Sequence, residues 1–501
     1  MSCTTILVGK NASFDGSTII ARNEDCPSGE FCEKRFSVSN AAGKKTYKSV
    51  IGHLEVPLPD GGGRYTCMPN ADLKEGLWEA AGVNAHNVAM TATETLTTNE
   101  RVLAADPLVA YKAAIGEPGQ DGYEAEQVGG IGEEDMVTLV LPYATSARDG
   151  VLRLGALLER YGTYEMNGIA FSDVDEIWWL ETVGGHHWIA RRVPDDCYVT
   201  MPNQLGIDSF DLDDAYGEKH CHLCSPDLRE WVAANHLDLS LDGQLNPRDA
   251  FGSHSDSDHV YNTPRAWAIQ RFLSPTAGPW DRALPAEDFG PECDRLAWCR
   301  RPERKVTIED VKYALSLCYQ GTPYDPYGHD PAGRPGRYRP IGINRNSQLA
   351  VLQLRPYEPE ATRALQWVSL GSNAYNALVP FYANVGRTPA YLEDTTTRVT
   401  SENFYWANRI IGALADGART GCVPHVERYQ EALPAATFAL VRACDERVRE
   451  DAVAGNDVCG ELEAANDAIA DECRRQTEAL LDHVLYEASM GMGNAFCRSD
   501  G

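Results

Sequence analysis

The chain has 501 residues and a formal net charge of −28 at pH 7. Such an acidic protein is poorly suited to bind nucleic acid or an anionic membrane surface. Hydrophobic residues make up 43% of the sequence, which is ordinary for a globular protein that buries a large core. Neither a secretory leader nor a run of about eighteen apolar residues is visible. We therefore expect a cytoplasmic protein without nucleic-acid or membrane partners.

The fifteen cysteines do not form a disulfide pattern, because their number is odd and their spacing irregular. Most of them are expected to be reduced, buried residues. One cluster, His220-Cys221-His222-Leu223-Cys224, has the Cys-x-x-Cys spacing of zinc ligands. A structural zinc site needs four ligands, and the sequence offers no second such pair, only His254 and His259 further along. We expect no metal and no other cofactor.

The N-terminal segment predicts a β-hairpin. Residues 4–8 and 18–21 are rich in β-branched and apolar side chains, and the residues between them favour a turn. An antiparallel pairing would bring Cys3, at the start of one strand, close to Arg22 and Asp25 at the end of the other. These three residues could then share one site.

The three side chains suit nucleophilic catalysis. A cysteine attacks as the thiolate, and the permanent charge of Arg22 would lower the pKa of the Cys3 thiol. If residues 1–2 are removed, the α-amine of Cys3 becomes a general base with a pKa of about 7.7–8.0, and Asp25 would orient it. The alternative is a buried strand cysteine beside a surface Arg–Asp pair.

The rest of the chain alternates between strand and helix signals. Apolar runs and period-2 patterns predict strands at 88–93, 176–182, 187–193, 197–201, 348–354 and 366–370. Helical periodicity, with Ser146 and Thr307 as N-cap residues, predicts helices at 133–143, 146–161, 307–320, 402–415, 424–453 and 458–489. Strands near both ends of the chain are expected to share one sheet.

Short motifs recur through the chain in a characteristic order. They are Cys3-Thr4-Thr5, Ala21–Asp25, Gly82–Asn84, Thr91–Thr95, Glu176–Glu181, Pro202–Gln204, Asn262–Arg265, Pro340–Arg345 and Gln366-Trp367. Taken together, the ordered set resembles the dipeptidase A (PepD) family of N-terminal-nucleophile cysteine hydrolases, relatives of penicillin V acylase and bile salt hydrolase. The matches cover roughly residues 3 to 400, and each motif alone is unspecific.

The resemblance implies an α+β fold, the αββα four-layer sandwich of antiparallel sheets. Residues 1–400 would form the catalytic domain, with residues 1–2 as a removed leader. Beyond these matches, the helical periodicity predicts that residues 401–501 form a helical C-terminal extension, which would serve packing or homo-oligomer contacts. The implied activity is a dipeptidase that cleaves small peptides through an acyl-enzyme on Cys3.

Two further site residues follow from the resemblance. Asn203 is expected to donate its amide N–H to the oxyanion, although an Asn after Pro is more often a turn residue. Arg265, near a helix start, matches the family's second arginine. It would set the charge of the site or hold a substrate carboxylate, the alternative being a surface arginine on a helix.

Glu94 departs from the family pattern. In the acylase relatives an Asn that helps to form the oxyanion hole follows the equivalent strand, so the second oxyanion donor is open here. A carboxylate at Glu94 could pair with the free α-amine of a peptide. The alternative is that Glu94 only caps or solvates the strand end.

Two other functions remain open. The same site could hydrolyse a non-peptide amide, such as an acylated amine or a β-lactam side chain. The chain could also be a non-catalytic metal-binding protein that uses Cys221 and Cys224.

Overall fold

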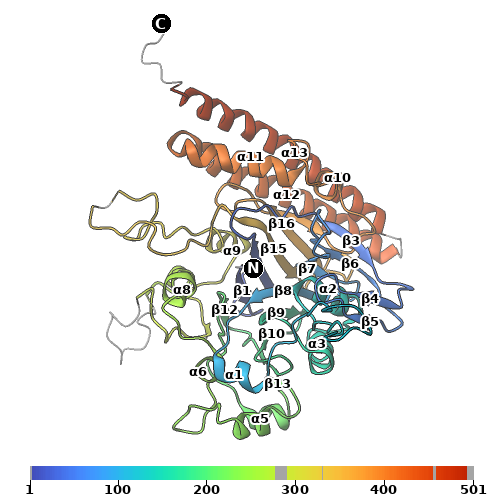
Figure 1. Cartoon of the computed structure of the whole chain (residues 1–501). Coiled ribbons are helices and arrows are strands. Elements are labelled where there is room, and N and C mark those ends of the chain that lie inside the picture. Colours follow the sequence, from blue (N-terminus) through green and yellow to red (C-terminus); the bar gives the residue numbers. More distant parts are fainter. Residues whose placement is uncertain (1–2, 277–289, 330, 455–457, 494–501) are drawn as a thin grey trace, which may run out of the picture.

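The computed structural model describes residues 3–276, 290–329, 331–454 and 458–493. Two large antiparallel sheets contact each other, and helices cover their outer faces (Figure 1). This arrangement confirms the α+β class. In the described ranges, no helix is both long and apolar enough to span a membrane.

The first sheet joins strands from both ends of the chain, as the sequence predicts. The N-terminal hairpin lies in its centre, where Cys3 is opposite Glu24 and Thr5 is opposite Arg22. The sheet has seven strands in the order β14 (Cys299–Arg300), β12 (Tyr198–Met201), β1 (Cys3–Val8), β2 (Thr18–Asp25), β15 (Asn346–Leu354), β16 (Ala364–Leu370) and β17 (Val379–Tyr382).

The second sheet contains the strands predicted at 88–93, 176–182 and 187–193, whereas the strand predicted at 197–201 lies in the first sheet. The pairing of β8 with β9 has a register shift between Ala92 and Glu94, which is a local irregularity next to the first sheet. The order is β13 (His222–Cys224), β11 (Trp188–Arg192), β10 (Ile177–Thr182), β9 (Asn167–Ser172), β8 (Ala89–Thr95) and β7 (Ala81–Val83). Two small two-stranded sheets pair β3 (Ser37–Asn40) with β6 (Arg64–Cys67) and β4 (Thr46–Lys48) with β5 (Glu55–Pro57).

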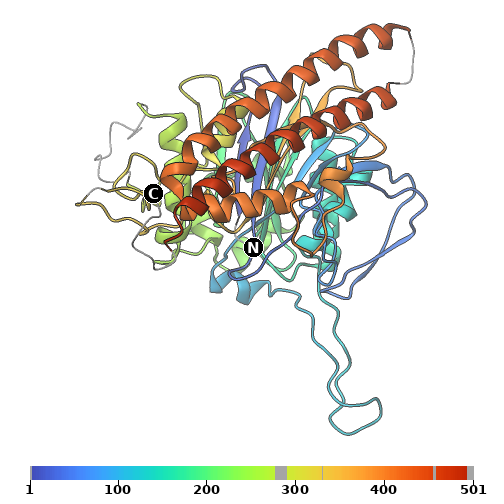
Figure 2. The same cartoon turned by 90° about the horizontal axis from the view of Figure 1, so that it is seen from above.

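Helices pack on the outer face of each sheet. Helices α2 (Glu133–Val140) and α3 (Ala147–Tyr161) contact strands of the second sheet. The long helices α12 (Arg419–Ala454) and α13 (Cys459–Met490) contact β17, and α11 (Phe404–Gly417) contacts β16. Figure 2 shows these three helices lying across the first sheet. The expected C-terminal helices are therefore confirmed, and they cover the sheet directly.

The shorter helices lie mostly between β12 and β15. They are α4 (Leu212–Tyr216), α5 (Leu228–Ala234), α6 (Pro247–Phe251), α7 (Asp258–Tyr261), α8 (Thr263–Leu273) and α9 (Ile308–Ala314), with α1 (Glu100–Ala105) and α10 (Ala390–Glu393) elsewhere. A 3-10 turn, Leu141–Tyr143, continues α2.

The N-caps of α3 and α9 agree with the sequence, but the end of α9 does not. Ser146 accepts a hydrogen bond from the backbone of Asp149, and Thr307 forms a capping box with Asp310. The helix predicted at 307–320 is too long, because α9 ends at Ala314. The Leu315 carbonyl instead accepts hydrogen bonds from side chains of the first sheet and its following loop.

Candidate active site

Cys3 is the first residue of the central strand β1 and is fully buried. Its side chain shares a face with Arg22, because Cys3 pairs with Glu24 and Thr5 pairs with Arg22 across the hairpin. The Arg22 Nη2 group donates a hydrogen bond of 3.2 Å to Sγ of Cys3. The structure thus brings together the thiol and the cation that the sequence places in one hairpin.

Arg22 is held by a buried acidic network. Its Nη2 lies 2.7 Å from Glu133 Oε1 and 3.5 Å from Glu24 Oε2, and its Nη1 donates to the Ala92 carbonyl at 2.8 Å. Glu24 in turn pairs with the buried Lys34 at 2.7 Å. A guanidinium in such contacts is fixed in position as well as in charge.

Glu133 is a site residue that sequence reasoning did not identify. It stands in the first turn of α2, in the run Glu133-Glu134-Asp135, and all three carboxylates are buried. Consecutive acidic residues at a helix start are usually explained by the helix dipole, so the pattern alone gives no reason to expect burial. The role of Glu133 in the site can be recognised only when α2 is known to face Arg22.

The thiol of Cys3 needs a base. Burial raises the pKa of Cys3 to about 12, and the neighbouring Arg22 opposes this effect without overcoming it. At neutral pH the sulfur in this environment is therefore a neutral thiol. A group that accepts its proton at the moment of attack would remove this barrier.

The backbone nitrogen of Cys3 is also positioned. It donates a hydrogen bond of 3.1 Å to Oδ1 of Asn203, and the Nδ2 group of Asn203 donates to the Thr95 carbonyl at 2.9 Å. The same Oδ1 accepts from Nη2 of Arg265 at 2.7 Å. Oδ1 of Asn203 thus contacts two donors, and its Nδ2 contacts an acceptor. These contacts fix the orientation of the side-chain amide.

Arg265 is fully buried on α8, so the alternative of a surface arginine is wrong. All five of its N–H donors have acceptors. They are the carbonyls of Tyr261 and Cys3, the Thr4 hydroxyl, and the side-chain oxygens of Asn203 and Asn262. A guanidinium with every donor occupied by protein atoms orients its neighbours, and it has no donor left for a substrate carboxylate.

Asp25 is buried at the end of β2, beside the residue that pairs with Cys3. Its carboxylate contacts the guanidinium of Arg339 and the side-chain amide of Asn346. In the part of the chain that the structure describes, the Cys3 nitrogen contacts Asn203 and not Asp25, whose carboxylate is paired with Arg339. Arg339 and Asn346 are therefore two more residues near the site that the sequence did not identify.

Glu94 is fully buried, so it does not solvate the strand end. The Thr5 hydroxyl donates to Oε2 of Glu94 at 2.8 Å, which joins β8 to β1 across the two sheets. Among the described residues, Oε1 has no hydrogen-bond partner. Burial raises the pKa of Glu94 to about 8, although Arg265 and Arg22 oppose the increase.

The raised pKa of Glu94 predicts a pH-dependent stability. The folded protein keeps this proton between pH 4.5 and about 8, whereas the unfolded chain loses it. The free energy of unfolding should therefore fall as pH rises through this window, by up to about 1.4 kcal/mol per unit from this residue. Glu94→Gln removes this contribution, so urea unfolding from pH 5 to 7.5 should show a shallower decline. Equal slopes would contradict the prediction, and the exposed Glu55→Gln is the control.

The segment His220–Cys224, which has the spacing of zinc ligands, forms hydrogen bonds within the protein. Nδ1 of His222 lies 3.0 Å from Oδ2 of Asp214, and Cys221 is exposed. Among the residues that the structure describes, no three His, Cys, Asp or Glu side chains are arranged to hold a metal ion.

Comparison with known proteins agrees with the sequence motifs. The family model described as "Peptidase family C69" matches residues 2–432. A "Dipeptidase" from Bifidobacterium longum (strain NCC 2705) is 58% identical over the whole of both chains. "Probable dipeptidase A" from Streptococcus pyogenes serotype M3 is 48% identical over the same extent. "Dipeptidase A" from Lactobacillus helveticus is 41% identical over 97% of this chain and 96% of its own. The chain therefore belongs to peptidase family C69.

Proposed function

We propose that Cys3 is the nucleophile of this dipeptidase and that its α-amine, once residues 1–2 are removed, is the general base. The observation that carries the proposal is that both reactive atoms of Cys3 are held. Its Sγ accepts from Arg22 at 3.2 Å, and its nitrogen donates to Asn203 at 3.1 Å. A base within the nucleophile's own residue answers the need created by the raised pKa of the thiol.

The reaction proceeds by acyl transfer. The Cys3 amine takes the thiol proton, and the sulfur forms a bond to the carbonyl carbon of the peptide. The resulting ammonium gives its proton to the leaving amine as the C–N bond breaks, which leaves a thioester. The same amine then accepts a proton from a water molecule as the water oxygen attacks the thioester carbon. The C–S bond breaks, and the ammonium returns this proton to the departing sulfur, which releases the free acid and restores the thiol. Arg22 stabilises the sulfur whenever it carries negative charge.

Asn203 is proposed as a donor to the tetrahedral oxyanion. Its amide is fixed by Thr95, Arg265 and the Cys3 nitrogen, so it needs no rearrangement when charge develops. Arg265 acts as a positioning residue, because it holds both Asn203 and the Cys3 carbonyl. Asp25 is proposed to support the amine end of the site through Arg339.

Glu94 is proposed to bind the α-ammonium group of the peptide. Its Oε1 is buried without a hydrogen-bond partner among the described residues, and a ligand N–H could satisfy it. A bound ammonium would also favour the carboxylate over the acid, which opposes the effect of burial on its pKa.

The test compares dipeptides with their N-acetyl derivatives and with non-peptide amides. Wild type should prefer the free dipeptide, and Glu94→Gln should lower kcat/KM for it by about tenfold or more, the loss expected for a desolvated charge pair. The same change should leave N-acetyl substrates nearly unaffected. Equal losses for both substrates would refute the role of Glu94, and a preference for the non-peptide amides would favour an acylase.

The fold is proposed to be the four-layer αββα sandwich of N-terminal-nucleophile hydrolases. Support comes from helices α2 and α3 on one sheet and α11 to α13 on the other. We propose residues 1–400 as the catalytic unit and 401–501 as its helical extension, since the site residues lie between Cys3 and Asn346. Homo-oligomerisation and a cytoplasmic location stay predictions.

A further inference from the structure

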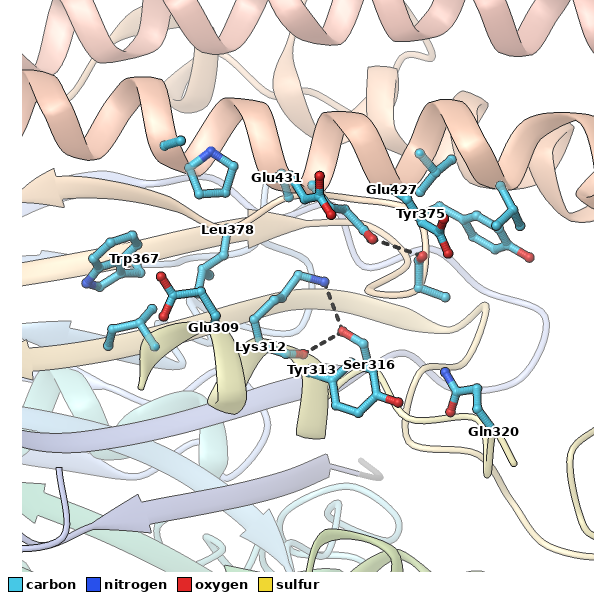
Figure 3. A pocket seen from close by; sticks show the side chains of 18 of the residues that line it. Glu309, Lys312, Tyr313, Ser316, Gln320, Trp367, Tyr375, Leu378, Glu427 and Glu431 are labelled. Atoms are coloured by element: carbon cyan, nitrogen blue, oxygen red, sulfur yellow. Dashed lines mark hydrogen bonds between the residues drawn. The ribbon is translucent and has the colours of Figure 1, made fainter. Parts of the chain in front are cut away.

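A cavity of about 590 Å³ lies between α9 and α12, over the loop and strand region around Trp367 and Leu378 (Figure 3). Its volume is within the range of sites that bind small organic molecules, about 300–1,000 Å³. Many of its lining residues are apolar, and four of these are buried: Ile308, Trp367, Leu378 and Val426.

The cavity is separate from the Cys3 site. Successive residues of a strand point to opposite faces of its sheet. On β2, Arg22 contacts Cys3, whereas the next residue, Asn23, donates to the Leu315 carbonyl just after α9. The helix that lines the cavity therefore lies on the opposite face of the first sheet from the thiol.

Lys312 of α9 and Arg419 of α12 are two cations that line the cavity. Nζ of Lys312 donates to the Ser316 hydroxyl at 2.9 Å (Figure 3). It also donates to the Asn373 carbonyl at 2.5 Å. Both partners are uncharged, and among the described residues no carboxylate forms an ion pair with this amine. Burial lowers the pKa of Lys312 to about 7. An ammonium group has three donors, so one more acceptor can be bound.

The cavity mouth has the opposite charge. Glu427 and Glu431 of α12 and Glu309 of α9 line the cavity and are exposed to solvent. The cavity lining therefore combines two cations, Lys312 and Arg419, with apolar side chains, and carboxylates stand at its mouth. It is complementary to a molecule that has a carboxylate, an ammonium group and an apolar side chain.

We propose that this cavity binds a small zwitterion with an apolar side chain, either a free amino acid or a dipeptide. The ligand carboxylate accepts from Lys312, the ammonium lies near the glutamates at the mouth, and the side chain packs on Trp367 and Leu378. A ligand carboxylate provides the counter-charge that the half-buried Lys312 amine lacks among the described residues. The proposal is independent of the chemistry of Cys3.

Binding should depend on the protonation of Lys312. Above pH 7 the free amine must first take up a proton, so affinity should fall as pH rises from 7 to 8.5, by less than tenfold per unit. Other titratable and charged groups that line the cavity, and can modulate this fall, are Glu309, Tyr313, Cys318, Tyr375, Arg419, Glu427 and Glu431.

The experiment uses the full chain with Cys3→Ala, so that no probe is hydrolysed. Calorimetry with L-leucine and with leucyl-leucine distinguishes the amino acid from the dipeptide as ligand. Leucinamide, which lacks the carboxylate, should bind at least tenfold more weakly than leucine. Adding Lys312→Met should weaken the tighter ligand at least tenfold, whereas the exposed Lys45→Met should have no effect. The change in tryptophan fluorescence on binding should be lost in Trp367→Phe.

Three results would overturn the proposal. They are the absence of binding by both probes, equal affinity for leucine and leucinamide, and unchanged affinity in Lys312→Met. With Cys3 intact, Lys312→Met should hydrolyse dipeptides at the wild-type basal rate when substrate is dilute. Loss of that activity would place Lys312 in the hydrolytic machinery and would also refute a separate site.

Discussion

Cys3→Ala is expected to abolish dipeptide hydrolysis while leaving the fold intact. Removing the nucleophile of a hydrolase whose catalytic residues act as a unit costs about 10⁶-fold in kcat. The change deletes one sulfur atom at a fully buried position and leaves the paired Arg22 and Glu133 in place. Initial rates with a dipeptide, together with thermal unfolding, would measure both effects.

The control for this prediction is a second buried cysteine, Cys473→Ala on α13. It removes the same atom far along the chain from the proposed site and should retain activity. Hydrolysis by Cys3→Ala at a rate close to that of wild type would reject Cys3 as nucleophile. Loss of activity in both variants would point to a general sensitivity of the fold.

Asn203→Ala should lower kcat by about 100–1000-fold without eliminating turnover. The change removes the proposed oxyanion donor and also the acceptor for the Cys3 nitrogen and for Arg265. Because the effect acts on the transition state, kcat should fall much more than KM rises. Steady-state kinetics on a dipeptide would separate the two parameters.

Asn262→Ala is the matched comparison. Asn262 also accepts a hydrogen bond from Arg265, and its Nδ2 donates to the Asn203 carbonyl at 3.0 Å. It supports Asn203 without serving as the acceptor for Cys3, so its loss should cost less in kcat. An Asn203→Ala enzyme within tenfold of the wild-type kcat would contradict the oxyanion role.

The N-terminal hairpin could be predicted because its determinants are local. The β-branched segments, the turn residues and the antiparallel register together place Cys3 beside Arg22. Strands that return late in the sequence were also predictable from their apolar pattern. They share a sheet with the N-terminal strands as expected, and the structure adds that β15 pairs with β2.

The remainder of the site depends on contacts between distant segments. Glu133 is 111 residues from Arg22 and approaches it only because α2 packs against β8. The register shift in β8 near Glu94 leaves no signature in a single sequence. At the early end of α9, Asn23 of β2 and Asn373 of the loop after β16 donate hydrogen bonds to the Leu315 carbonyl. Such long-range packing overrides local propensity.

The hydrogen-bond partners of Arg265 could not be predicted from its motif either. The pattern Asn262-Thr263-Pro264-Arg265 predicts a helix start, which α8 confirms. Only the folded chain shows that all five donors of Arg265 are taken by protein acceptors. This finding changes the expected role from holding a substrate carboxylate to positioning Asn203 and Cys3.

The most direct test of the account is the mass of the N-terminal peptide of purified, active protein. We predict a chain that begins at Cys3, because only then does the nitrogen beside Asn203 become a basic amine. Activity should rise in proportion to the fraction of chains that have lost residues 1–2. Full activity in a sample that begins at Met1 or Ser2 would contradict the amine as general base.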